Sequence, residues 1–327
     1  MVILNPSSGR GSGARLLPSL RQILADRGVA YDLAQTEGLH HAVDLARQAS
    51  LDGYETVVAV GGDGTISEVV NGLALAAGET EIVGTLGVIP VGTGNDFADM
   101  AGIPRKTEEA LAVIRAGRSH LVDLGRFHIR GQTVQDGAAR AGAAQGQMQD
   151  EYRYFNNNLG CGFEAQVTVE SRKIQRLRGF AVYLTAIFKA LISYPLPDIA
   201  VSWTDEDGRA HQVDKQMLMI SIGNSRRTGG GFYVTPDAIM DDGLYDLAMA
   251  DGLSRGRIMV LLPKVMMGTH PGDPALTFVR ARQIRITSPS ILPVHADGEI
   301  ISRNADELEI TIQPQRLRVL TPGLRPK

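Results

Sequence analysis

Cysteine is almost absent from the sequence. Cys161 is the only one among 327 residues, so the chain can form neither an internal disulfide framework nor a zinc site built from several cysteines. An excess of one charge is also missing, because 33 Lys and Arg stand against 36 Asp and Glu and leave a net charge of −3. A dedicated duplex nucleic-acid binder usually shows a strong basic excess. We therefore expect no nucleic-acid partner.

Long hydrophobic runs are missing as well. No stretch approaches the roughly 18 uninterrupted apolar residues of a membrane span. Residues 1–6 lack the basic and apolar regions of a signal peptide. We therefore expect a cytoplasmic protein. Hydrophobic residues still make up 43% of the chain, which is enough for a sizeable core, and the length favours about two domains.

Glycine, by contrast, is abundant. The chain has 37 glycines, about 11% of its residues against an average usage of about 7%. Aromatic residues are scarce and proline is ordinary, so the composition is neither collagen-like nor of low complexity. We expect the glycines to occupy particular turns.

Up to about residue 125, short apolar runs alternate with segments of helical periodicity. The pattern predicts strands at residues 2–4, 29–34, 56–60 and 86–91, and helices at residues 14–27, 39–49, 66–77, 96–100 and 107–116. This alternation predicts a parallel sheet with helices on both faces.

The second half of the chain has a different pattern. We expect antiparallel strands at residues 152–157, 198–204, 217–222, 245–250, 283–287, 299–302 and 307–313, with Asp-Gly turn signals at residues 207, 242 and 297. Residues 132–150 are rich in Ala, Gly and Gln and are predicted to form a long surface excursion. A mostly-β second domain follows.

One segment of the second half is helical in its spacing. A single apolar stripe consists of Ile174, Leu177, Ala181, Leu184, Phe188 and Leu191, and the accompanying basic residues are Arg172, Lys173, Arg176, Arg178 and Lys189. No acidic residue lies between Glu170 and Asp198. Such a helix either packs its stripe on its own sheet with a solvated basic face, as is usual, or lies on an anionic membrane surface.

Three glycine-containing loops follow predicted strands. Residues 61–65, Gly-Gly-Asp-Gly-Thr, end a buried strand and open a helix, where backbone N–H groups and the helix dipole favour an anion such as phosphate. Asp63 would be placed to hold Mg²⁺ through water, although the same loop also suits a plain helix-capping turn. Residues 5–9 and 90–96 follow two other strands, at the edge where open α/β sheets bind ligands. Neither the Rossmann nor the P-loop glycine motif is present in place.

These loops carry a resemblance to a known family. Residues 5–9, residues 61–65 with Glu68, and residues 92–96 resemble the three nucleotide-loop motifs of the diacylglycerol kinase catalytic domain. Residues 157–165, 236–246 and 295–299 resemble later segments of the soluble bacterial lipid kinases grouped with diacylglycerol and sphingosine kinases. The family usually has Asp where Glu164 stands. The likeness covers nearly the whole chain.

The resemblance implies an architecture. Residues 1–124, with a C-terminal return at about residues 314–327, would form a Rossmann-like, NAD kinase/diacylglycerol kinase-like α/β domain that binds the nucleotide. Residues 125–313 would form a β-sandwich-like domain for the lipid substrate, and the nucleotide would lie in the cleft between the two domains.

The resemblance also implies roles for individual residues. Glu299 would be the general base, Asp63 would hold the catalytic magnesium and Asp297 would support that network. A structural magnesium would be held by the main-chain carbonyls of Ile239 and Leu244 and by Asp242. By themselves, the Asp-Gly pairs at 297 and 242 predict only turns. ATP would contact Asn5, Pro6, Ser7, Ser8, Gly9, Thr36, Gly61, Gly62, Asp63, Gly64, Thr65, Ile66, Ser67 and Thr93.

The implied function is an ATP- and Mg²⁺-dependent lipid kinase. The first candidate substrate is diacylglycerol, which would give phosphatidic acid; sphingoid bases, phosphatidylglycerol and other hydroxyl lipids stay open. NAD kinase shares the Gly-Gly-Asp-Gly-Thr loop, but residues 90–96 do not resemble its second motif. A non-catalytic lipid- or nucleotide-binding regulator is a further alternative. A lipid substrate implies peripheral contact with the inner face of the membrane, and a homodimer stays open.

Overall fold

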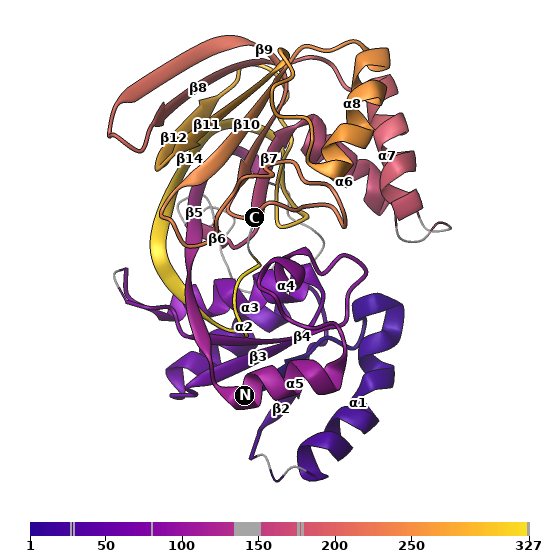
Figure 1. Cartoon of the computed structure of the whole chain (residues 1–327), viewed down its shortest axis with the longest axis vertical. Coiled ribbons are helices and arrows are strands. Elements are labelled where there is room, and N and C mark those ends of the chain that lie inside the picture. The colour runs from indigo at the N-terminus through magenta and orange to yellow at the C-terminus, as the bar shows by residue number, and fades with distance from the viewer. Residues whose placement is uncertain are drawn as a thin grey trace. The chain divides into compact units, whose positions relative to one another are not determined.

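The computed structural model describes residues 1–26, 28, 30–79, 81–133, 152–174, 177 and 180–325 (Figure 1). It divides into two compact units. Unit 1 comprises Met1–Leu124 and Pro314–Lys327, and unit 2 comprises Gly125–Gln313. The surface excursion predicted at residues 132–150 begins with the last two residues of a strand, and the rest of it lies outside the described residues.

Unit 1 contains a parallel sheet, as its alternating sequence pattern predicts. Its strands run in the order β2-β1-β3-β4, and the end of β14 joins β4 in parallel through Arg318 and Val319. Apolar, largely β-branched runs form the central strands because both faces of the sheet are covered. The strands are β1 (Val2–Leu4), β2 (Leu33–Gln35), β3 (Thr56–Gly61), β4 (Thr85–Pro90) and β14 (Glu299–Leu320).

Five helices alternate with these strands, and the predicted helices are confirmed with shifted ends. The largest shift is at α1, whose span begins at Ser8, although residues 9–11 adopt left-handed backbone angles and the regular helix follows only after them. Gly72 lets α2 and α3 pack closely, since a Cβ there would clash with the carbonyl of Val43. The helices are α1 (Ser8–Asp26), α2 (His41–Leu51), α3 (Asp63–Ala76), α4 (Asp96–Met100) and α5 (Thr107–Ala116).

Unit 2 is built from antiparallel strands, as predicted. One row runs β11-β10-β9-β7-β13-β14. The strands β8 and β12 pair with each other and join residues 210–216 of β9 to residues 307–311 of β14. The long strands β9 and β14 therefore belong to both layers of a β-sandwich-like fold. The strands not yet given are β5 (Ser119–Thr133), β6 (Arg153–Phe155), β7 (Asn158–Gly162), β8 (Asp198–Thr204), β9 (Ala210–Gly223), β10 (Tyr245–Asp251), β11 (Leu276–Ala281), β12 (Gln283–Thr287) and β13 (Val294–Ala296).

The core of unit 2 is aromatic at its centre. Phe155 stacks on Tyr245 with 5.6 Å between the ring centroids, and Phe127 lies tilted against Phe155 at 6.1 Å. All three side chains are buried, and Cys161 of β7 lies in the same cluster. Such ring pairs contribute about 0.5–1.5 kcal/mol beyond the apolar area that they bury.

The helices of unit 2 correct one prediction. The helical stripe predicted at residues 174–191 is confirmed only in its second part, where α7 (Phe180–Ser193) lies; α6 (Phe163–Arg172) ends before the stripe, Ile174 and Leu177 are not helical, and residues 175, 176, 178 and 179 lie outside the described residues. The α8 helix (Arg255–Met267) was not predicted, since Pro263 interrupts its pattern. Among the described residues, no helix has both the length and the apolar character needed to cross a bilayer.

Candidate active site

The sheet of unit 1 has a point at which the direction of its connections reverses. From β1 the chain passes to β2 on one side, and it then crosses to β3 and β4 on the other side. In open α/β sheets, ligands bind beyond the carboxyl ends of the strands at this kind of point. Here it lies between β1 and β3, where residues 5–9 and 61–65 leave the sheet. We call these two segments the Asn5 loop and the Asp63 loop.

Side-chain hydrogen bonds join the Asn5 loop to the Asp63 loop. The Asn5 side-chain amide donates to the Thr65 hydroxyl at 3.0 Å, and the Ser8 hydroxyl lies 3.3 Å from the same oxygen. The carboxamide oxygen of Asn5 accepts the Ser7 N–H at 3.0 Å, which tightens its own turn. Asn5 and Ser8 therefore hold the shape of the two loops.

A third segment, the Thr93 loop (residues 91–95), packs against the Asp63 loop. A Cβ on Gly92 would lie 2.7 Å from the Gly62 Cα, so neither glycine can carry a side chain without separating the loops. The Asn95 side chain accepts the Gly92 N–H at 2.8 Å and donates to the Gly92 carbonyl at 3.0 Å. Three loops from three adjacent strands thus form one continuous backbone surface.

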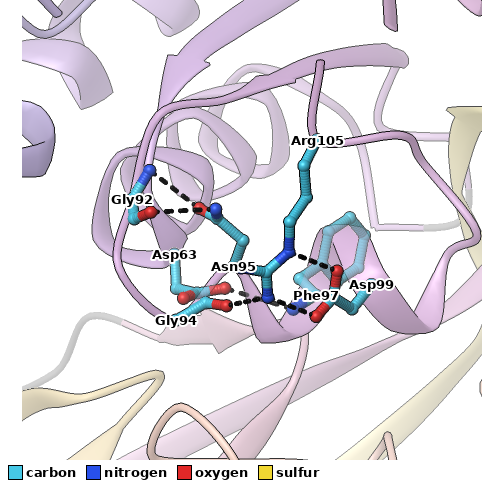
Figure 2. Close-up of polar contacts among 7 residues, drawn as sticks. All are labelled: Asp63, Gly92, Gly94, Asn95, Phe97, Asp99 and Arg105. Atoms are coloured by element: carbon cyan, nitrogen blue, oxygen red, sulfur yellow. Dashed lines mark hydrogen bonds and ion pairs between the residues drawn. The ribbon is translucent and has the colours of Figure 1, made fainter. Parts of the chain in front are cut away.

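Asp63 lies at the N-terminus of α3 and reaches the next short helix. Its carboxylate accepts the backbone N–H of Phe97 at 3.1 Å, in the first turn of α4 (Figure 2). The Asp63 side chain therefore links the Asp63 loop to the segment that follows the Thr93 loop.

Arg105 is a site residue that the sequence pattern did not reveal. Its guanidinium donates to both carboxylate oxygens of Asp99, at 3.0 and 2.6 Å, and to the Gly94 carbonyl at 2.9 Å (Figure 2). The hydrogen bond to Asp99 and the nearby charges of Asp96 and Asp63 raise the pKa of Arg105. Arg105 therefore fastens the Thr93 loop to α4.

The Asp63 loop has the space and the carboxylate that a nucleotide phosphate and Mg²⁺ require. A Cβ at Gly64 would meet no atom within 4 Å, so the space beside this part of the loop is open. A carboxylate such as Asp63 is the hard oxygen ligand that Mg²⁺ takes, usually with phosphate oxygens and water. The described residues contain no group of three metal-ligating side chains. A Mg²⁺ at Asp63 would therefore complete its coordination with phosphate oxygens and water, and the residues fit that arrangement.

The other residues that were predicted to contact the nucleotide differ in their exposure to solvent. Thr36 follows β2 directly, and its N–H donates to the Leu4 carbonyl at 2.9 Å. Ile66 and Ser67 are buried in α3, and the Ile66 N–H donates to the Gly62 carbonyl at 3.1 Å, whereas Thr93 is exposed. Nucleotide contact by these residues stays a prediction.

Glu68, which belongs to the second motif, has a structural contact. Its two carboxylate oxygens accept the N–H groups of His40 and Ala42, each at 3.2 Å. These donors lie at the N-terminus of α2, where a negative charge is stabilised by the helix dipole. Glu68 therefore anchors α2 to α3.

In unit 2, the predicted Asp-Gly hairpin turn is confirmed between β13 and β14. Asp297 and Gly298 have φ angles of 49° and 79°, both in the left-handed region that such a turn requires. The Asp297 carboxylate accepts three successive backbone N–H groups, those of Asn156 at 3.0 Å, Asn157 at 2.9 Å and Asn158 at 3.0 Å. Asp297 therefore ties the turn to the start of β7.

Glu299 follows the turn and lies among basic groups. Its carboxylate accepts a hydrogen bond from Arg153 at 3.0 Å, and the side chain is 22% exposed. Arg172 donates to the Gly298 carbonyl at 3.2 Å. These contacts orient a solvent-accessible carboxylate at the end of a rigid hairpin.

A buried pair supports the same turn from below. His295 accepts the Gly298 N–H on Nδ1 at 3.4 Å, so its proton lies on Nε2 when the ring is neutral. That nitrogen is 3.3 Å from the carboxylate of Glu164, without the alignment of a hydrogen bond. His295 therefore has a hydrogen-bonding role at this turn.

Asp242 occupies a separate turn. Its carboxylate accepts the Leu244 N–H at 3.1 Å and forms an ion pair with Arg280. Burial raises the pKa of Asp242, and the Arg280 charge opposes that rise. Ile239 lies half-buried and Leu244 buried in the same segment. The oxygen donors suit Mg²⁺, but a metal bound to Asp242 would have to share that carboxylate with Arg280 or displace it.

Comparisons with known proteins define the class. The diacylglycerol kinase catalytic domain family matches residues 1–127, and the YegS C-terminal NAD kinase beta sandwich-like domain matches residues 157–321. A diacylglycerol kinase of Mycobacterium tuberculosis (strain ATCC 25618 / H37Rv) is 30% identical over 326 residues, covering 98% of this chain and 94% of the relative. A diacylglycerol kinase of Bacillus subtilis (strain 168) is 28% identical over 302 residues, covering 91% and 88%.

Solved structures show the same fold. A crystal structure of a diacylglycerol kinase from Bacillus anthracis str. Sterne superposes with a TM-score of 0.66 at 19% identity, covering 98% of this chain and 95% of the other. Another from the same organism gives a TM-score of 0.72 at 21% identity, with 98% and 94% covered. The protein is thus a kinase with an α/β domain and a β-sandwich-like domain. The chain belongs to the diacylglycerol kinase family of lipid kinases.

Proposed function

We propose that the protein transfers the γ-phosphate of ATP to the hydroxyl of diacylglycerol, giving phosphatidic acid. The observation that carries this proposal is the set of three loops joined at the reversal point of the unit 1 sheet, with Asp63 at the N-terminus of α3. The names of the curated relatives support diacylglycerol as the acceptor. Sphingoid bases, phosphatidylglycerol and other hydroxyl lipids are the alternatives within the class.

The two units have different tasks in this proposal. Residues 1–124 and 314–327 bind the nucleotide, and residues 125–313 bind the lipid. Backbone N–H groups of the Asp63 loop and the dipole of α3 stabilise the phosphates, and the side chains of Asn5, Ser8 and Thr65 keep the loops in place. Asp63 holds the catalytic Mg²⁺. When bound, this ion neutralises charge that develops on the phosphate oxygens.

Glu299 is the proposed general base. Its carboxylate takes the proton of the lipid hydroxyl while the hydroxyl oxygen attacks the γ-phosphorus and the bond to ADP breaks. Arg153 orients the carboxylate, and Asp297 holds the turn in register with β7. Asp242, with the carbonyls of Ile239 and Leu244, is proposed to hold a structural Mg²⁺, which would compete with Arg280.

A phosphorylation assay with radiolabelled ATP tests this proposal. We expect label in diacylglycerol above sphingoid bases, phosphatidylglycerol and NAD, and no label with Asp63→Ala. Label in NAD and in no lipid would overturn the kinase substrate class proposed here. Preference for another lipid would overturn only the choice of diacylglycerol.

The structural metal site needs its own test. We expect purified protein to contain tightly held Mg²⁺ and Asp242→Asn to lose it, with a lower melting temperature, because a ligand that binds only the folded state stabilises it. Unchanged metal content and melting temperature would contradict the site.

A lipid acceptor also places the protein at the inner face of the membrane, in peripheral contact, and a homodimer stays open.

A further inference from the structure

The outer surface of α7 is unexpectedly apolar. Its buried side consists of Ala186, Ile187, Ala190 and Leu191, which pack into unit 2. Phe188 and Ile192 lie on the opposite side and are 47% and 72% exposed. The predicted stripe thus divides, since Leu191 packs inward while Phe188 faces outward. A helix that is apolar on both sides normally has a partner on both sides.

The α8 helix repeats this arrangement. Ile258 and Leu261 are buried, while Val260 and Met267 are 57% and 66% exposed. Val260 and Met267 are seven residues apart in α8 and therefore lie on the same side of the helix. The two helices are neighbours, because Arg255 at the start of α8 donates to the Ile192 carbonyl at 3.1 Å near the end of α7. Figure 1 shows α7 and α8 beside each other in unit 2.

Both helices pack their inner sides into one hydrophobic cluster with β9 and β10, which includes Leu191, Leu218, Ala250 and Ile258. Their outer sides therefore face away from that cluster together. We call this surface the α7–α8 face and define it by Phe188, Ile192, Val260 and Met267, with the exposed basic residues Lys189, Arg255 and Lys264.

The charge of this region differs from that of the rest of the chain. Residues 171–197 contain no acidic residue and five basic ones, of which Lys173 pairs with Glu170 outside this stretch and Lys189 is exposed on α7. Residues 252–272 again contain no acidic residue and three basic ones; Arg257 pairs with Asp273, whereas Arg255 and Lys264 are exposed on α8. The whole protein has a net charge of −3. A local positive excess on such a chain is complementary to an anionic surface.

We propose that the α7–α8 face docks the protein on anionic lipid bilayers, with its four apolar side chains entering the headgroup region and its basic residues contacting the headgroups. Apolar side chains flanked by Lys and Arg are the chemistry of interfacial helices. Each basic residue near an anionic surface adds electrostatic attraction that salt weakens. This proposal specifies the membrane contact of the proposed function, but it rests on exposure and charge rather than on the reaction.

Vesicle sedimentation tests the docking face. We expect the full chain to sediment with phosphatidylcholine vesicles that contain phosphatidylglycerol, less with phosphatidylcholine alone, and less as salt is added. Ile192→Glu and Val260→Glu should each weaken partitioning at least about tenfold, since each replaces an apolar side chain that enters the headgroup region with a negative charge. Leu51→Glu is the matched control, because Leu51 is an exposed apolar residue of unit 1 at 63%.

Two further measurements make the outcome decisive. Circular dichroism melts of Ile192→Glu and Val260→Glu should match the parent, which excludes unfolding as the cause. Equal sedimentation of these variants and the parent would overturn the proposal. So would light scattering that shows a dimer dissociated by Ile192→Glu while vesicle binding persists, because the face would then bind a second copy.

Activity separates this proposal from the proposed function. On diacylglycerol dispersed in detergent micelles, Ile192→Glu should retain the parent rate, and on anionic vesicles it should be at least about tenfold slower, in line with its weaker partitioning. Equal rates on vesicles would count against the docking face. A protein that docks through this face but phosphorylates no lipid would contradict only the proposed function.

Discussion

The two candidate site regions are built by different means. In unit 1, backbone geometry shapes the site, since glycines let the Asp63 and Thr93 loops touch and short polar side chains tie them together. In unit 2, charged side chains hold the turn that carries Glu299, through Arg153, Arg172 and the carboxylate of Asp297. An added methyl group should therefore damage the first region, and a neutralised charge should damage the second.

Among changes at the Glu299 turn, Glu299→Gln should have the largest effect on the reaction. The variant keeps the size of the side chain but removes the proposed base, so we expect kcat to fall about 10²–10⁴-fold. The melting temperature should change little, because the bond from Arg153 is partly exposed and an amide oxygen can still accept it. Steady-state kinetics and a thermal melt measure both.

Glu309→Gln is the control for this change, because Glu309 is an exposed carboxylate further along β14. A Glu299→Gln enzyme at full rate would show that the proton leaves by another route. That result would contradict the role of Glu299 as the base, but it would leave the structural description of the turn unchanged.

Asp297→Asn should reduce stability more than any other charge change proposed for this turn. Asn tolerates the left-handed backbone. Its side chain, however, has an NH₂ group in place of one carboxylate oxygen, and this group would face backbone N–H donors whose hydrogen bonds the Asp297 carboxylate accepts. Hydrogen bonds to a charged group are each worth about 1.5–3 kcal/mol. We expect a loss of about 2–3 kcal/mol of unfolding free energy in urea titrations.

The matched control is Asp207→Asn at another Asp-Gly hairpin turn, where the side chain is exposed and pairs with Arg209. Its stability should be unchanged. Equal stability of both variants and the parent would mean that the Asp297 charge does not hold the turn.

Two glycine variants test the backbone side of the comparison. Gly92→Ala places a methyl group 2.7 Å from the Gly62 Cα, so we expect a loss of about 1–3 kcal/mol and weaker ATP binding. Gly64→Ala meets no atom within 4 Å in the free protein, so its stability should stay the same. If phosphates approach this backbone, its KM for ATP should nevertheless rise. An unchanged KM for Gly64→Ala would contradict that approach.

Arg105→Lys should have a moderate effect. Lys cannot donate to both oxygens of Asp99 and to the Gly94 carbonyl in the same planar geometry. We expect about 1 kcal/mol less stability, because half of the Arg105 side chain is exposed to screening solvent. The KM for ATP should rise while kcat changes less. Arg209→Lys, in an exposed pair with Asp207, provides the control and should change neither value.

Cys161 gives the smallest expected signal and a direct probe of the Glu299 turn. Burial raises the pKa of the Cys161 thiol, with a further contribution from Glu164, so little reactive thiolate exists in the folded protein. A thiol reagent at pH 8 should react slowly with the native protein. After denaturation it should react with one thiol per chain. Cys161 pairs with Val294 beside the turn, so Asp297→Asn should speed the native reaction. Fast labelling of Cys161 in the native parent would contradict the burial of this thiol beside the turn.

Much of unit 1 could be predicted because its signals are local. Buried strands are continuous apolar runs, and the helices between them have their own periodicity, so order and type follow from short windows. The glycine motifs also indicated the ends of strands. Arg105 and Asp99 escaped prediction, because their contact depends on how α4 turns the chain back on the Thr93 loop.

Unit 2 was harder to predict in detail. Residues 299–302 and 307–313 were expected as two strands, but they belong to the single strand β14, which pairs with different neighbours along its length. The α7 stripe likewise could not be assigned to an inner or outer side, because both sides of the helix are apolar. Pairing partners and the buried side are decided by distant segments, which short windows do not contain.

The sequence by itself determined the family, the order of most elements and the loops that follow the parallel strands, because these depend on local periodicity and on residue types at fixed spacing. Only the tertiary structure decided that Asp297 binds three backbone N–H groups, that Arg105 clamps Asp99, and that Phe188 and Ile192 face outward. The physical reason is that burial and hydrogen-bond partners are properties of the packed chain. Asp297 and Asn156, for example, are 141 positions apart in sequence.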